Sequence, residues 1–493
     1  MVRQIAPPII EMQTAARHYL LLVGIAVAGL ALILRAGSHL PAPAAPLPVP
    51  SARQTVGSET QTPALPLGQA VKQRLVQNAA DPLSRFFLQL FFVITVSYGI
   101  GWLFTRCGQP AVVGEMLAGV LLGPSVFGWL APNAFQFVFT ASSLDALRLL
   151  SQVGVCLFMF AVGMEMDWAH LRQKGSTAIL VSHASIAIPG LLGGGLAYLF
   201  YNRLAQPGAS FAPFALFVAV SMSITAFPVL VRILQDRGIL KTSLGQIASA
   251  CAAIGDATAW GLLALLLAFA KSTDFAAAAL CLAFVLIFVA VLFFVIKPNL
   301  PGWLGQEAIE RAKPAKSLLA IVVAIVLACA FCTQWLGIHA LFGAFVAGLI
   351  MPTTGGFRAK LGVRLENISS VLLLPVFFAS SGLRTEIGLL HGHTDWLICL
   401  VIIVFATVGK LGGSSLAARL TGLGWRESLQ LGALMNTRGL MELIALNLGY
   451  ELHILSQRAF SMLVLMALVT TVMTGPLLTL FGSRRVTVSS KPS

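Results

Sequence analysis

The chain has 493 residues, of which 57% are hydrophobic and only 10% are charged. A soluble domain carries roughly 25% charged residues, so this composition argues against a soluble enzyme or binding module and is typical of a protein with many membrane spans. The net charge of +14 does not indicate nucleic-acid binding, because Lys and Arg occur singly at the ends of apolar runs, where they act as topology signals.

The N-terminal part of the chain divides into an apolar run and a linker. The run at 19–34 follows Arg3 and Arg17 and precedes a stretch rich in Pro, Ala and Ser. It fits either a cleaved signal segment or an uncleaved extra helix, and we assign residues 1–35 to this element. Residues 36–82 show little periodicity, which is typical of a flexible linker.

Most of the remaining chain consists of apolar runs separated by short polar loops. A helix needs about 20 mainly apolar residues to cross a bilayer. Thirteen runs after the linker qualify as expected spans, or fourteen with the first one, and they lie at 86–105, 111–130, 146–164, 177–201, 211–233, 243–269, 275–296, 317–335, 338–352, 366–383, 396–418, 428–449 and 459–481.

The distribution of basic residues predicts the orientation. Lys and Arg are concentrated in alternate loops, and such loops remain in the cytoplasm. This places the short tail, residues 483–493, inside the cell. We therefore expect an integral protein of a bacterial inner (plasma) membrane that contacts the lipid bilayer along all of its spans.

Four charged residues lie deep within predicted spans, where a charge costs at least about 2.5–3.5 kcal/mol. Asp256, Lys410, Arg438 and Glu442 each reach the middle third of the membrane at about 1.5 Å per residue. Arg438 and Glu442 are four residues apart and can pair on one helix face, so a structural and a transport role are equally plausible for them. Asp256 has no partner in its own span and must be protonated, ion-bound or paired across helices, which favours a transport role.

Two predicted spans look interrupted. Pro228 stands inside 211–233, and Gly439 follows Asn436 and Thr437 inside 428–449. A proline in a spanning helix frees backbone groups, which is tolerated only beside protein or a wet cavity. Interrupted spans of opposite direction in the two halves of a chain are typical of an inverted-repeat transporter.

From about residue 83 to 482 the sequence resembles the second monovalent cation/proton antiporter family, and most closely its plant exchangers and their bacterial relatives. Several motifs in the family's usual wording carry the resemblance: QPAVVGEMLAGVLLGPSVFG (109–128), LFMFAVGMEMD (157–167), SITAFPVL (223–230), ALFGAFVAGLIMP (340–352), FFASSGLRTEIGLL (377–390) and NTRGLMELIALNLG (436–449).

The resemblance implies an all-α polytopic fold, the inverted-repeat sodium/proton antiporter fold, in which 83–482 form thirteen helices with two crossed discontinuous ones. It implies a homodimer built on a dimerisation panel, with a core that moves across it. Asp256 matches the family's ion-binding carboxylate, Lys410 the basic residue facing it, and Thr225 stands at the helix break. Gly255 departs from the family, which usually has Asp or Asn there.

We therefore expect a secondary-active antiporter that exchanges Na⁺ or K⁺ for protons at one site. Asp256 would bind a proton or a cation, with further oxygen ligands from Thr225 and from carbonyls near Phe227. With no side chain at Gly255, the simplest hypothesis pairs Lys410 with Asp256 in the empty site and gives electroneutral exchange. A gated cation channel, such as a potassium efflux channel, and a transport-inactive membrane sensor or scaffold remain as alternatives.

Searches for catalytic and cofactor motifs return little. The sequence has no GxxxxGK[ST] phosphate loop, no HExxH motif and no plausible nucleophile triad. We therefore predict no enzyme activity, no cofactor, no metal centre and no nucleic-acid partner.

Overall fold

The computed structural model describes residues 9–40, 81–165, 175–271, 275–310, 316–337 and 339–482, together with Arg74 and Asn78. Nearly all of the predicted linker and the whole predicted tail lie outside these ranges. Within them all regular secondary structure is helical apart from one isolated β-bridge between Ala205 and Leu455. Twelve of the described helices are long and apolar enough to cross a membrane, so the chain is an integral membrane protein.

Two predicted spans are not among these twelve helices. Run 338–352 contains only a short apolar helix, α17 (Ala340–Leu349). Run 428–449 is divided between α21 (Trp425–Met435) and α22 (Leu440–Glu451). The N-terminal run is longer than predicted and forms α1 (Ile9–Gly37).

One group of helices, which we name the panel, lies on one side of the molecule. Two helices of the panel, α4 (Ala111–Leu122) and α19 (Leu374–Leu383), touch at Gly119. A Cβ at this position would stand 2.1 Å from the carbonyl oxygen of Phe378, so only glycine allows the contact. The short helices α5 (Phe127–Leu130) and α6 (Pro132–Val138) connect two panel members. The panel consists of α3 (Pro82–Arg106), α4, α7 (Ala141–Glu165), α16 (Lys316–Trp335), α17, α18 (Phe357–Ile368) and α19.

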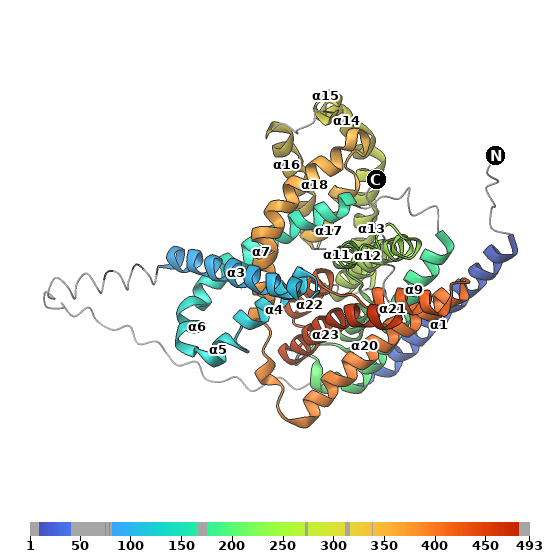
Figure 1. The fold of residues 1–493 in the computed structure, drawn as a ribbon, viewed down its shortest axis with the longest axis horizontal. Coiled ribbons are helices and arrows are strands. Elements are labelled where there is room, and N and C mark those ends of the chain that lie inside the picture. Colours follow the sequence, from blue (N-terminus) through green and yellow to red (C-terminus); the bar gives the residue numbers. More distant parts are fainter. Residues whose placement is uncertain are drawn as a thin grey trace, which may run out of the picture.

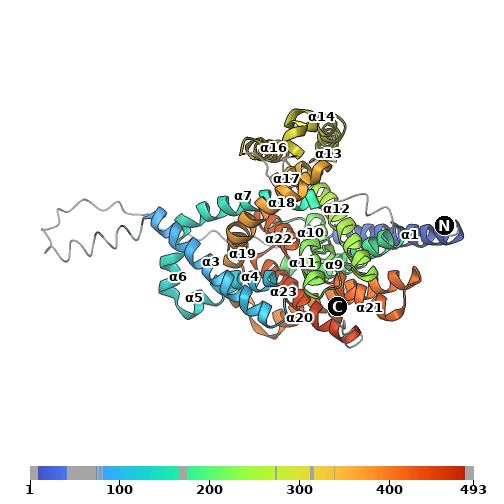
Figure 2. The same cartoon turned by 45° about the horizontal axis from the view of Figure 1, so that its top comes forward.

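A second group, which we name the core, packs beside the panel. In both views α3, α5 and α6 lie at one side of the molecule and α1 and α21 at the other, with α22 and α23 between them (Figures 1 and 2). The core consists of α9 (Gly175–Leu204), α10 (Phe211–Ser223), α11 (Phe227–Asp236), α12 (Ser243–Lys271), α20 (Gly392–Leu420), α21, α22 and α23 (Gln457–Phe481).

The remaining helices connect or flank these groups. The core leads back to the panel through α13 (Phe275–Val291), η1 (Leu292–Ile296), α14 (Lys297–Leu304) and α15 (Gln306–Glu310), of which α14 and α15 lie at the top of Figure 1. Helix α1 packs along α9 of the core, where its Tyr19 ring meets the His183 ring edge-on at 5.2 Å.

Large apolar side chains are exposed on the outer faces of both groups. Leu480 on α23 of the core is 74% exposed and Trp335 on α16 of the panel is 78% exposed. Contiguous apolar surface of this kind is rare on soluble monomers, whereas spanning helices present it to lipid. The four charged side chains predicted to lie deep in the spans, Asp256, Lys410, Arg438 and Glu442, are instead buried inside the molecule.

Candidate functional site

The two interrupted spans are broken helices that cross at their breaks. Helix α10 ends at Ser223 and α11 begins at Phe227, while α21 ends at Met435 and α22 begins at Leu440. The amide of Ala226 donates to the carbonyl of Thr437 at 3.0 Å. The two crossed discontinuous helices that the sequence predicted are therefore present.

Each break exposes backbone groups that need partners, because the last carbonyls and first amides of a helix have none within it. At the end of α10, the Arg438 guanidinium donates to the carbonyls of Ser221 and Met222, at 2.8 Å each. Lys410 Nζ donates to the carbonyl of Ser223 at 2.5 Å and also to Thr225 Oγ1. Two cations thus cap one helix C-terminus, where the helix dipole favours positive charge.

Asp256 lies on the other side of the same break, at the N-terminus of α11. It stands within α12 and is only 1% exposed. Its Oδ2 accepts a hydrogen bond from the amide of Phe227, the first residue of α11, at 3.3 Å. A helix N-terminus favours negative charge, so this position suits a carboxylate. Its Oδ1 is buried and has no hydrogen-bond partner among the described residues.

Lys410 does not form the ion pair with Asp256 that we predicted from the sequence. It is fully buried, and within the described residues its Nζ is satisfied by the Ser223 carbonyl and the Thr225 hydroxyl. The physical reason is the broken helix itself, because the carbonyl freed at the end of α10 accepts from Lys410. The sequence did not indicate which side chain would reach that carbonyl. Thr225 Oγ1 in turn donates to the carbonyl of Met435 at 3.3 Å.

Arg438 and Glu442 form the predicted pair, although not on one helix face, because Arg438 lies in the break between α21 and α22. Their Nη1 and Oε2 atoms are 3.1 Å apart, and both side chains are 0% exposed. The backbone of Arg438 is also anchored, because its amide donates to Thr471 Oγ1 at 3.0 Å. Through Ser221 and Met222, Arg438 therefore joins the two broken helices to each other.

Gly255 faces a polar group that sequence reasoning missed. An added Cβ at this glycine would stand 3.3 Å from Ser182 Oγ on α9. Ser182 is fully buried, and its hydroxyl has no hydrogen-bond partner in the described part of the chain. The sequence carried little signal for it, since a serine in an apolar helix usually bonds to its own backbone.

A cavity of about 1100 Å³ opens near the other end of α11. It lies between the panel and the core, and its lining includes Cys107 and Gln109 after α3, Arg232 and Asp236 on α11, and Thr479 on α23. Arg232 is five residues beyond Phe227, about 8 Å along the helix. Helix α11 therefore connects the wall of this cavity to the amide that holds Asp256.

Comparison with curated proteins identifies full-length and partial relatives. The Na⁺/H⁺ antiporter NhaS4 of Synechocystis is 39% identical over 389 residues, 79% of this chain and 95% of that protein. Cation/H⁺ antiporter 19 of Arabidopsis thaliana is 37% identical over 398 residues, and K⁺/H⁺ antiporter 1 of Saccharomyces cerevisiae is 33% identical over 407. The chain spans about half the length of these last two relatives (49% and 46%).

The fold is similar to that of a solved antiporter. The structure of the sodium proton antiporter MjNhaP1 from Methanocaldococcus jannaschii has a TM-score of 0.55 at 13% identity, with 82% of this chain and 100% of that chain covered. A family model described as "Sodium/hydrogen exchanger, transmembrane" matches residues 86–482. The chain therefore belongs to the sodium/hydrogen exchanger family, as its motifs predicted.

Proposed function

We propose that the protein is a cation/proton antiporter in which Asp256 carries either a proton or a monovalent cation. One observation supports this above all. Asp256 is a fully enclosed carboxylate with one oxygen on a helix N-terminus and the other without a hydrogen-bond partner in the described residues. An isolated charge in such a place is too costly to persist, so the carboxylate requires an occupant.

Exchange follows from competition for that occupant. A proton or a cation neutralises Asp256, and a neutral site crosses the membrane at low cost, whereas the empty anion does not. A cation would find Oδ1 of Asp256 and one remaining lone pair of Thr225, whose hydroxyl already accepts from Lys410 and donates to Met435. The relatives are named for Na⁺ and for K⁺, so both remain substrates of the proposal.

We further propose that exchange is electroneutral. Lys410 caps the end of α10 and has no ion pair with Asp256 in the described structure, so a cation entering the site displaces no lysine. Lys410 then keeps its charge throughout the cycle. One proton would leave Asp256 for each monovalent cation bound.

The experiment is a transport assay in proteoliposomes. An entrapped pH-sensitive dye reports proton flux when Na⁺, K⁺, Li⁺ or Rb⁺ is added separately, with the membrane potential clamped by valinomycin in the Na⁺ series. We expect coupled exchange at a rate independent of the imposed potential. A rate that follows the imposed potential would refute electroneutral exchange but leave the antiporter proposal intact.

Two other outcomes would contradict the antiporter proposal itself. Cation flux without proton movement would indicate a channel, and no flux with any of the four cations would indicate a sensor or scaffold. Asp395→Asn is the matched control for Asp256→Asn, because Asp395 is a buried core aspartate (4% exposed) that already has partners in His391 and Arg458. We expect this control to exchange like the wild type.

A further inference from the structure

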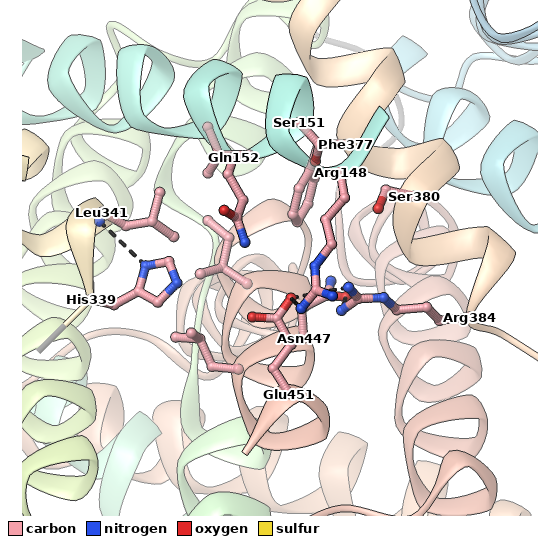
Figure 3. Close-up of a pocket in the computed structure, with 13 residues that line it drawn as sticks. Arg148, Ser151, Gln152, His339, Leu341, Phe377, Ser380, Arg384, Asn447 and Glu451 are labelled. Carbon is pink, nitrogen blue, oxygen red and sulfur yellow. Dashed lines mark hydrogen bonds and ion pairs between the residues drawn. The ribbon is translucent and has the colours of Figure 1, made fainter. Parts of the chain in front are cut away.

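A cluster of three charged side chains lies where the panel meets the end of α22. Glu451, the last residue of α22, accepts from Arg148 at 2.8 Å and from Arg384 at 3.0 Å. Figure 3 shows the two guanidinium groups converging on one carboxylate. The side chains of Glu451 and Arg384 are 21% and 16% exposed, so this is a partly enclosed network and not a solvated surface pair.

The cluster joins the panel to the core. Arg148 is on α7 and Arg384 directly follows α19, both in the panel, whereas Glu451 is in the core. Arg384 also donates to Asn447 Oδ1 at 2.7 Å, and Asn447 Nδ2 donates back to Ser381 Oγ at 2.7 Å. A displacement of the core relative to the panel would therefore break several charge-assisted bonds at once.

This cluster and the large cavity lie at opposite ends of the molecule. Helix α23 begins six residues after Glu451 and ends beside the cavity, where Thr479 forms part of the lining. These 25 residues cover about 37 Å. The cavities at the cluster measure about 40 and 460 Å³, against about 1100 Å³ at the other end. The larger of these cavities thus lies at the end away from the cluster, and charged side chains bridge the panel and the core at the other end.

We propose that Arg148, Arg384 and Glu451 form a lock that closes this end of the transport path and must open before Asp256 is exposed there. The proposal rests on the antiport function proposed above. Helix α22 carries Glu442 in its first turn and Glu451 at its end, about 13 Å apart along a rigid element. Movement of the crossing and opening of the lock are therefore mechanically coupled.

Three native cysteines allow a test that does not depend on transport. Cys156 lines the 460 Å³ cavity with Glu451 and is 7% exposed. Cys107 is exposed at the large cavity, and Cys251 is buried in the core at 1% exposure. The full chain in detergent receives short pulses of N-ethylmaleimide, and modification at each cysteine is quantified by peptide mass spectrometry.

Opening the lock should expose Cys156 selectively. In Glu451→Gln we expect the modification rate of Cys156 to rise about two- to fivefold, as for loss of a partly exposed ion pair, while Cys107 and Cys251 react as in the wild type. Asp395→Asn is the matched control, because it breaks an ion pair with Arg458 that joins α20 to α23 within the core. It should leave the Cys156 rate unchanged.

The outcomes distinguish an opened lock from a loosened fold, and failure of the lock proposal from failure of the antiport proposal. An unchanged Cys156 rate in Glu451→Gln, or an equal rise in Asp395→Asn, overturns the lock. If Cys251 also becomes reactive, Glu451→Gln has loosened the fold, and Arg148→Gln decides instead, since that side chain is 44% exposed. Failure of the antiport proposal appears in the liposome assay, whereas failure of the lock appears in the labelling.

Discussion

The two carboxylates at the helix crossing differ in one respect. Asp256 and Glu442 are both enclosed, each near the start of a half-helix. Glu442 has a cation 3.1 Å away, in the break just before its own helix, whereas Asp256 has one backbone amide and no ion pair in the described structure. Asp256 and Glu442 are thus both buried, and they differ in whether a cation is paired with the carboxylate.

We interpret this difference as one between a charge that stabilises the fold and a charge that binds the transported ion. A buried ion pair stabilises one arrangement, and removing either partner leaves an uncompensated group. A buried carboxylate without a counter-charge must take a proton or a cation from solution. We therefore propose that Arg438 and Glu442 hold the crossing in shape, while Asp256 exchanges its occupant.

The largest expected effect is that of Asp256→Asn. We expect cation-driven proton flux to fall to that of protein-free liposomes, because an amide neither releases a proton nor neutralises a cation. The protein should fold, since the side-chain oxygen can still accept from Phe227. Exchange near the wild-type rate in the liposome assay would contradict the proposal that Asp256 binds the exchanged proton and cation.

Arg438→Ala should have the largest effect on stability. It removes the ion pair with Glu442 and also uncaps the carbonyls of Ser221 and Met222. Breaking a buried pair costs about 3–5 kcal/mol of unfolding free energy. Denaturant titration in detergent measures this, and a variant as stable as the wild type would mean that the pair has no structural role.

Glu442→Gln should be milder. The amide oxygen still accepts from Arg438, and the guanidinium keeps its two carbonyl acceptors on α10. We expect a loss of about 1–2 kcal/mol, close to that of one hydrogen bond to a charged group. The same titration, run beside Arg438→Ala, checks the order, and a larger loss than in Arg438→Ala would reverse our assignment of the capping role.

The smallest effects are expected at Gly255. Gly255→Ala gains helix propensity but brings a methyl group to 3.3 Å from Ser182 Oγ, so we expect a stability change below about 1 kcal/mol. Gly255→Asp adds a second carboxylate beside Asp256 and should make the exchange rate depend on membrane potential. If the potential dependence is the same in Gly255→Asp and wild type, position 255 does not control the charge carried per cycle.

Much of the fold was already determined by local sequence. Runs of about 20 apolar residues predict spanning helices because every backbone group in lipid must be satisfied within its own helix. Pro228 and Gly439 indicated both breaks for the same local reason, since proline lacks an amide donor and glycine weakens a helix. The i, i+4 spacing of Arg438 and Glu442 predicted their pairing correctly, although Arg438 lies in the break and not on the helix.

Only the tertiary structure decided which group each charge contacts. Lys410 binds the end of α10 instead of Asp256, and Glu451 binds two arginines that lie 303 and 67 residues before it in the chain. The sequence indicated that the break at Pro228 frees carbonyls, but not which side chain would reach them, because that side chain comes from another helix. Periodicity describes one helix at a time, whereas the partners of buried charges come from helices that meet only after folding.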